Sequence, residues 1–149
     1  MRTALATLTL WVAFLAVAGA GGSKPPIVLR FHLQTMSQTG TNWTQVEVPD
    51  PPQMILVEKY SFLSEKYVTQ ATALPDGNTL IQFDSIGSNV LDTTTSSAPG
   101  KILVVICNSR VVYAPVIDQP LRQGRIIVPG ITPEELKALK LYITKRSKS

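Results

Sequence analysis

The sequence predicts an α+β domain, in which an antiparallel sheet built from hairpins carries two helices packed on one face. Two observations predict this class. Stretches of alternating or continuous apolar residues, typical of strands, recur along residues 27–128 and are separated by short turns rich in Gly, Pro, Asn and Asp. Only two helical patterns occur, both late in the chain, so the regular strand-helix alternation of a parallel sheet is absent from the pattern.

The first pair of predicted strands lies near the start of this region. Residues 27–34 alternate between apolar and polar side chains, which is typical of a half-buried strand. Turn-forming residues follow at 37–42 and the alternation resumes at 43–48, so we expect these two strands to form a hairpin. The proline-rich segment 49–52 lacks backbone donors and should end the hairpin before a new apolar stretch at 54–57.

A second hairpin has a stronger local signal. Residues 67–74 and 79–83 flank a short connection that contains Asp76-Gly77, and Asp-Gly is a favoured turn pair because it tolerates positive φ. Residues 84–97, rich in Ser, Thr and Gly, have the local propensity of a loop. The helical spacing of their apolar residues nevertheless predicts a weak helix, with Asp84 or Ser85 as its cap.

The strands of the second half are short. The run 101–107 is too uniformly apolar for a surface strand, so we expect it at the centre of the sheet, with Cys107 as a buried and inert thiol. A turn leads to the partner strand 110–113, which stops at Pro115 because proline cannot donate to the ladder. Another short strand is expected at 125–128.

The last helix has the clearest start signal in the chain. Thr132 is the expected cap, Pro133 takes the first helical position, and Glu135 completes a capping box. Apolar residues repeat on one face of the following segment, while Lys137 and Lys140 lie on the opposite face. We therefore expect this helix to dock by its apolar stripe and to present lysines to water.

The beginning of the chain has the layout of a signal peptide at 1–20. A basic residue precedes an apolar run of about 15 residues at 4–18, short of the roughly 20 that cross a bilayer, and small residues lead to Ala20. We expect cleavage near Ala20 and an exported protein, periplasmic or extracellular; retention as an anchor is the alternative. The remainder is expected to be one domain, with N-terminal strands and a proline-rich connection at 21–66 and a second half at 67–149.

Charge is distributed unevenly along a chain whose formal net charge is +4. Residues 21–100 hold four basic and seven acidic residues, whereas nine basic residues stand against three acidic ones from 101 onward. An anionic partner such as a phospholipid surface would suit the basic half, and a solvated basic face is the alternative. The candidate binding residues on the basic half are Arg110, Arg122, Arg125, Lys137 and Lys140. Nucleic acid is not expected, because these residues are not interleaved with an aromatic platform.

Residues suited to catalysis are sparse. His32, the single histidine, is on the polar side of the first predicted strand, and one cysteine cannot form an internal disulfide. Clustered zinc ligands and a glycine-rich phosphate loop are not apparent in the sequence. The closest carboxylate pair, Glu134 with Glu135, is explained by helix capping. The sequence therefore predicts no enzyme activity, no cofactor and no metal.

Several short motifs recur in one order in the second half. Their residues are Gly87, Thr94, Gly100, Lys101, Ala114, Pro115, Gly124, Gly130 and Glu135. In this order the segment of about 67–143 resembles the head of the first periplasmic domain of SecD, a protein-export subunit. In that family a helix beginning with Gly and carrying Thr near its end precedes a Gly-Lys strand. An Ala-Pro-x-Ile segment, a Gly-containing strand and a helix opening with Thr/Ser-x-Glu-Glu then follow.

The resemblance implies a module that handles polypeptide or an envelope protein. Three departures are visible: Asn108-Ser109 replaces the usual Asp-Gly turn, Gln123 stands where the family has the first of two glycines, and Ile131 replaces an aromatic residue. The resemblance does not extend to the transmembrane bundle that carries the proton-coupling carboxylates of SecD. We therefore expect that this chain does not pump by itself.

Two hypotheses of different classes follow for the function. In the first, the chain is a non-enzymatic interaction module that binds polypeptide or an envelope protein partner through exposed strand edges. In the second, it is a small periplasmic ligand-binding protein or hydrolase on a borrowed fold, which a deep pocket bringing His32 against Asp or Ser side chains would favour. A structural envelope protein without a dedicated ligand is a third alternative.

Overall fold

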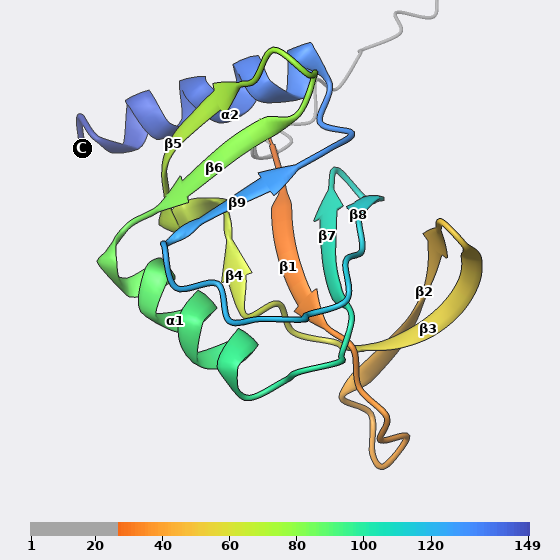
Figure 1. The fold of residues 1–149 in the computed structure, drawn as a ribbon. Helices are drawn as coiled ribbons and strands as arrows, with labels where there is room; N and C mark the ends of the chain where they lie inside the picture. The colour runs from red at the N-terminus through yellow and green to blue at the C-terminus, as the bar shows by residue number, and fades with distance from the viewer. Residues whose placement is uncertain (1–26) are drawn as a thin grey trace, which may run out of the picture.

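The structure, a computed structural model, describes residues 27–149 (Figure 1). Nine strands, two α-helices and one short 3-10 helix make up this part of the chain. In chain order they are β1 (Leu29–Leu33), β2 (Trp43–Pro49), β3 (Pro52–Glu58), β4 (Leu63–Ser64), η1 (Glu65–Tyr67), β5 (Val68–Ala73), β6 (Thr79–Phe83), α1 (Ser85–Ser96), β7 (Leu103–Cys107), β8 (Arg110–Tyr113), β9 (Arg125–Val128) and α2 (Pro133–Arg146).

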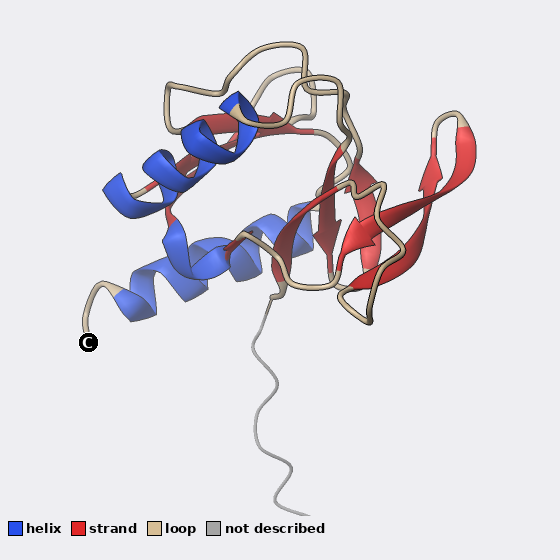
Figure 2. Cartoon of the chain, turned by 90° about the horizontal axis from the view of Figure 1, so that it is seen from below, coloured by secondary structure: helices blue, strands red, loops and turns tan. Residues whose placement is uncertain are grey.

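All strand pairs are antiparallel, and the α+β class is confirmed. The strands are shared among three small sheets, with the orders β4-β1-β7-β8, β2-β3 and β5-β6-β9. Helix α2 lies along β5, and α1 contacts β4 and β6 (Figures 1 and 2). Arg146, at the end of α2, donates hydrogen bonds to the carbonyls of Glu65, Lys66 and Val68, which fastens this helix to the start of β5.

The predicted pairing of the first two strands is wrong. Strand β1 lies between β4 and β7, and β2 instead pairs with β3 in a hairpin whose turn is Asp50-Pro51. The proline-rich segment thus forms the turn of the β2-β3 hairpin. Pro49 and Pro52 are the last pair before the turn, where the missing N–H groups cost few inter-strand hydrogen bonds. Alternation along a strand specifies which face is buried but not which strand is its neighbour.

Both faces of β1 are covered, so the expectation of a half-buried strand is also wrong. Leu29 and Phe31 are fully buried on one face, and His32 on the other face is only 9% exposed. The β2-β3 hairpin covers this second face: Val48, Ile55 and Val57 form a small apolar cluster with Val104 of β7.

The elements from β5 onward agree with their sequence signals. Strands β5 and β6 form the expected hairpin, and Asp84 caps α1 by accepting a hydrogen bond from the Gly87 N–H at 2.7 Å. Strand β7 is central, between β1 and β8. Thr132 and Glu135 form the predicted capping box at the start of α2.

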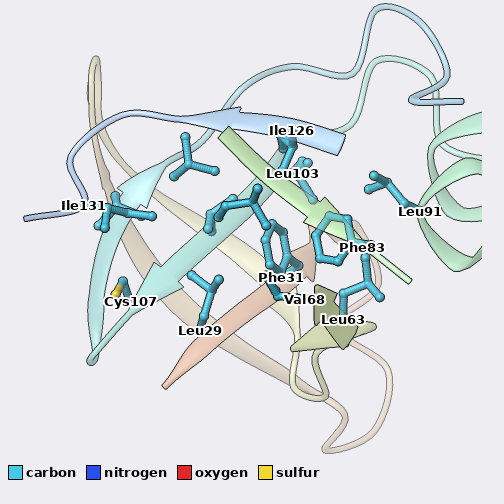
Figure 3. Packing of buried hydrophobic residues seen from close by; sticks show 14 of the residues in the cluster. Leu29, Phe31, Leu63, Val68, Phe83, Leu91, Leu103, Cys107, Ile126 and Ile131 are labelled. Atoms are coloured by element: carbon cyan, nitrogen blue, oxygen red, sulfur yellow. The ribbon is translucent and has the colours of Figure 1, made fainter. Parts of the chain in front are cut away.

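The main core lies between the four-stranded and three-stranded sheets. Phe31 of β1 and Phe83 of β6 meet edge to face, with ring centroids 5.4 Å apart (Figure 3). Cys107 lies in the same cluster, as expected. Because the cluster draws on Ile27 as well as Leu139, residues from both ends of the described region share one core.

The predicted signal peptide at 1–20 lies outside the described residues. Among residues 27–149, no helix is both long and apolar enough to cross a bilayer.

The fold generates a prediction at Gly124, which precedes β9 with a φ of 64°. A Cβ atom there would lie 2.2 Å from Ser88 Oγ, so any side chain meets both backbone strain and a clash with α1. We expect Gly124→Val to lower the free energy of unfolding by at least about 3 kcal/mol.

Gly77→Val is the matched control for this substitution. Gly77 also has a positive φ, 85°, but a Cβ atom at this position would have no other atom within 4 Å. It should lose only the backbone term, about 1–2 kcal/mol. Equal melting temperatures for the two variants would contradict the close packing of Gly124 on α1.

Candidate binding groove

An open apolar groove lies beside β9 in the described region. Its volume is about 590 Å³, within the range of small-molecule and peptide sites. Four stretches of chain line it: the β5-β6 turn region, the start of β7 at Leu103, the segment from the end of β8 to Gln123, and β9 itself. Its main apolar lining residues are Leu74, Leu80, Tyr113, Val116, Leu121 and Ile127. Val116 and Ile127 are 59% and 49% exposed, so the groove presents apolar surface to solvent.

One wall of the groove is the segment 114–123, and its first part is fixed against β7. The Leu103 N–H donates to the Pro115 carbonyl at 2.9 Å, and Ile117 exchanges hydrogen bonds with Gly100 and Lys101, both at 2.8 Å. These bonds continue the antiparallel pairing of β7 beyond the end of β8. Pro115 therefore lies opposite Leu103 and Ile117 lies opposite the Gly-Lys pair, and the bonds on both sides of Val116 hold this residue at the groove.

The second part of this wall is fixed by Thr95, on the last turn of α1. The Thr95 side chain is 1% exposed, and its hydroxyl donates to the Leu91 carbonyl at 2.7 Å. The same oxygen accepts a hydrogen bond from the Leu121 N–H at 2.9 Å. Sequence analysis selected Thr94, but Thr94 is only half-buried and the Thr95 hydroxyl is the one that binds the wall.

The other motif glycines lie where backbone segments approach closely. At Gly87, a Cβ atom would lie 2.8 Å from Tyr67 Cβ and 3.0 Å from Phe83 Cβ, so this glycine lets α1 pack against the start of β5 and the end of β6. Gly130 has a φ of 76° and accepts a hydrogen bond from the Arg110 side chain through its carbonyl. Both glycines therefore allow close backbone packing outside the groove lining.

The five candidate basic residues do not form one patch. Arg125 lines the groove, and Arg122 lines an adjoining hollow that shares Leu121 and Gln123 with it. The Arg122 side chain is 73% exposed, and its Nε atom forms a long ion pair with Asp92 Oδ1 at 3.8 Å.

The remaining three basic residues lie elsewhere. Lys137 and Lys140 are exposed on α2 and flank a separate shallow hollow. Arg110 is held by Glu135 in a two-pronged ion pair, at 2.8 and 2.9 Å, which ties β8 to the start of α2. Only Arg122 and Arg125 are therefore placed beside the groove, and the expected anionic surface partner of the lysines stays a prediction.

Neither His32 nor Cys107 lines the groove. His32 Nδ1 lies 2.9 Å from the Glu58 carbonyl oxygen, and the ring is not part of the groove lining. Burial, reinforced by the Glu135 carboxylate against the opposing effect of Arg110, raises the pKa of the Cys107 thiol to about 11. Among residues 27–149, no group of His, Cys, Asp and Glu side chains is arranged to hold a metal ion.

Sequence analysis did not identify the apolar lining of the groove. The only local signal was the short apolar segment Val116-Ile117, enclosed between Pro115 and Pro120. The fold brings this segment beside β9 although Ile127 is ten positions further along the chain. The fold and the groove together define an α+β domain with an apolar groove that is open to solvent.

Comparison with known proteins identifies the family. The family model described as SecDF, P1 head subdomain, matches residues 39–146, and the chain belongs to this family. The protein translocase subunit SecD of Rickettsia bellii (strain RML369-C) is 30% identical over 94 residues, which cover 60% of this chain. The chain spans only 18% of that relative's length.

Two solved structures share the fold. One is described as "Structure and function of a membrane component SecDF that enhances protein export"; it has a TM-score of 0.55 and 20% identity, with 78% of this chain and 61% of that chain covered. The other is described as "Crystal structure of SecDF in Super-membrane-facing form"; it has a TM-score of 0.58 and 20% identity, with 80% and 19% covered.

The ion pair at the start of α2 generates a prediction about pH. Burial acts to raise the pKa of Glu135, but hydrogen bonds from the Thr132 N–H and the Arg110 guanidinium outweigh it and lower the pKa below 4.5. Because the pKa of Glu135 is lower in the folded than in the unfolded state, the ionised carboxylate stabilises the fold at any pH above the unfolded-state pKa. This stabilisation is lost as the pH falls through the folded-state pKa.

We therefore expect wild-type protein to be more stable than Glu135→Gln at neutral pH, with the difference shrinking as the pH falls below 4.5 and through the lower folded-state pKa of Glu135. Urea unfolding across this pH range measures the difference. Glu134→Gln, which changes an exposed carboxylate of the same helical turn, is the control and should show a much smaller effect at neutral pH. A Glu135→Gln deficit that is independent of pH would contradict the assignment.

Burial of Cys107 generates a second prediction. At mildly alkaline pH the folded protein should react with a thiol-specific disulfide reagent at least about a hundredfold more slowly than the urea-unfolded chain, because the buried thiol is protonated and inaccessible. Absorbance of the released reagent measures both rates. Equal rates would place Cys107 at the surface.

Proposed function

We propose that this chain is a non-enzymatic interaction module of the cell envelope, which binds extended polypeptide segments in the groove beside β9 as part of protein export. The single observation that carries this proposal is the open apolar groove of about 590 Å³, which is lined by the exposed residues Val116 and Ile127. Exposed apolar surface concentrated in one hollow is a common property of protein-binding sites.

The chemistry of the lining favours a polypeptide ligand. Its charged side chains are Asp118 and Arg125, and Gln119 and Gln123 add amide groups, so a mainly apolar surface carries a few polar groups that can bind a backbone. A segment of unfolded chain presents the same mixture, because apolar side chains and unpaired amides are exposed together. Membership of the SecDF P1 head family supports a role in protein export.

The proposed location follows from the same family and from the predicted signal peptide at 1–20. The described domain is proposed to supply the polypeptide-binding step of export.

Site-specific photocrosslinking tests this function. A photoreactive phenylalanine analogue is placed at Val116 in the groove, or at Ile86 on α1 as the control, and each protein is mixed with a reduced, alkylated, permanently unfolded polypeptide. The two positions are matched, since Val116 is 59% and Ile86 is 60% exposed, but Ile86 is not part of the groove lining. We expect crosslinks at Val116 at least about tenfold above those at Ile86; equal yields would refute binding in the groove.

Charged substitutions at the same two positions provide an equilibrium measurement. Val116→Asp should weaken binding of the labelled unfolded polypeptide at least tenfold, or about 1.4 kcal/mol, because an apolar contact is replaced by a charge that binding must desolvate. Ile86→Asp should leave affinity unchanged. Fluorescence anisotropy measures both, and melting temperatures verify that each variant is folded.

A further inference from the structure

We propose that the polypeptide binds as an additional strand on the free edge of β9, with its backbone hydrogen-bonded to Arg125 and Ile127. This binding mode rests on the proposed function of the groove and specifies how the ligand is held there. Strand addition to an exposed sheet edge takes affinity from main-chain hydrogen bonds, and it takes specificity from pockets for alternate side chains.

The first step is the hydrogen-bond pattern of β9. In the three-stranded sheet β9 pairs only with β6, so its second edge has no strand neighbour among residues 27–149. The Phe83 N–H donates to the Gly124 carbonyl at 2.9 Å, which sets the phase of the β6-β9 ladder. Along an antiparallel strand, every second residue directs its backbone N–H and C=O groups at the same neighbouring strand. Two positions after Gly124, the backbone groups of Ile126 therefore point to β6, and so do those of Val128. The N–H and C=O groups of Arg125 and Ile127 therefore point to the free edge.

The second step is the position of the groove relative to this edge. Alternate side chains of a strand point to opposite faces of its sheet. Ile126, which is buried in the core, and Ile127, which is on the outer face, both line the groove. A hollow that touches both faces of β9 passes along its edge, where the outward amides of Arg125 and Ile127 lie.

The third step explains why the chain does not fill this edge itself. The nearest candidate is the wall segment 114–123, but its carbonyl and N–H groups at Pro115 and Ile117 are bonded to the β7 region, and the Leu121 N–H is bonded to Thr95. Pro115 and Pro120 have no N–H to offer. The bonded groups at Pro115, Ile117 and Leu121 are thus directed away from β9, and no backbone hydrogen bond joins the segment to Arg125 or Ile127 in the described region, so the edge is left for a separate chain.

The fourth step identifies the class of ligand. A four-residue strand spans roughly 13 Å, so the edge accommodates a short extended segment. Its side chains on one face would contact the apolar lining at Leu80 and Val116. Where the groove joins the hollow beside Arg122 and Arg125, two guanidinium groups favour an acidic residue. We infer that the preferred ligand is an extended segment with alternating apolar residues and a carboxylate at one end.

A pair of substitutions at Ile127 tests the backbone contact. Ile127→Pro removes an N–H that does not bond to β6, and proline is tolerated on edge strands, so the variant should fold. Ile127→Ala removes the side chain but keeps the N–H. For a fluorescent peptide of alternating valine and threonine ending in aspartate, we expect Ile127→Pro to bind at least tenfold more weakly than Ile127→Ala. Equal affinities of the two folded variants would overturn strand addition.

N-methylated peptides give a test that leaves the protein unchanged. Methyl groups on one alternate set of peptide amides remove the donors that face β9, whereas methyl groups on the other set remove donors that face away. We expect at least a tenfold loss of affinity for wild-type protein with one set and little change with the other. Equal affinity of both sets and the unmethylated peptide would overturn strand addition, while continued crosslinking at Val116 would leave the proposed function intact. Absence of crosslinking to Val116 would refute the proposed function itself.

Amide hydrogen exchange measures the same edge directly. In free protein the amides of Arg125 and Ile127 should exchange faster than those of Ile126 and Val128, which bond to β6. Saturating unmethylated peptide should slow exchange at Arg125 and Ile127 at least about tenfold. Exchange at these two amides that is unaffected by bound peptide would overturn the proposed contact.

Discussion

The buried hydroxyl group of Thr95 joins α1 to the wall of the groove, and hydrogen bonds to the β7 region hold the other part of this wall. The Thr95 oxygen donates to the Leu91 carbonyl within α1 and accepts from the Leu121 N–H in the groove wall, so the helix and the wall are joined at one atom. A buried donor without a partner costs about 1–3 kcal/mol, and the partly buried Leu121 N–H avoids such a cost through its bond to Thr95. This bond holds the wall against α1.

The family motifs acquire a physical explanation from this arrangement. Gly100-Lys101 and Ala114-Pro115 lie on neighbouring segments whose hydrogen bonds extend the β7 ladder, and Pro115 contributes a carbonyl where an N–H is not required. Gly124 then allows the chain to pass against Ser88 of α1 and enter β9. None of these residues has to touch a ligand in order to matter, because each one places the wall or the edge strand that the ligand would contact.

Local sequence signals predicted local structure well and spatial neighbours poorly. Strands β8 and β9 and the capping box of α2 were predictable because turn residues and helix caps act within a few positions. The neighbours of β1 were not predictable, because an alternating pattern specifies the buried face of a strand and not the strand it pairs with. The burial of His32 was not predictable either, because the β2-β3 hairpin that covers it comes from a later segment of the chain. The groove was missed for the same reason: Leu80, Val116 and Ile127 have ordinary surroundings in the sequence and become a site only through the fold.

An open strand edge is also a hazard, because identical chains can pair along it. Here the hazard is limited by the strand's short length, four residues, and by a charged Arg125 at its start. Val116 lines the groove together with β9, so a chain that pairs with this edge has to contact the groove lining as well. The short length of the edge and its charged start, which limit self-association, would therefore also favour the proposed ligand, a single short extended segment with a carboxylate near the two arginines.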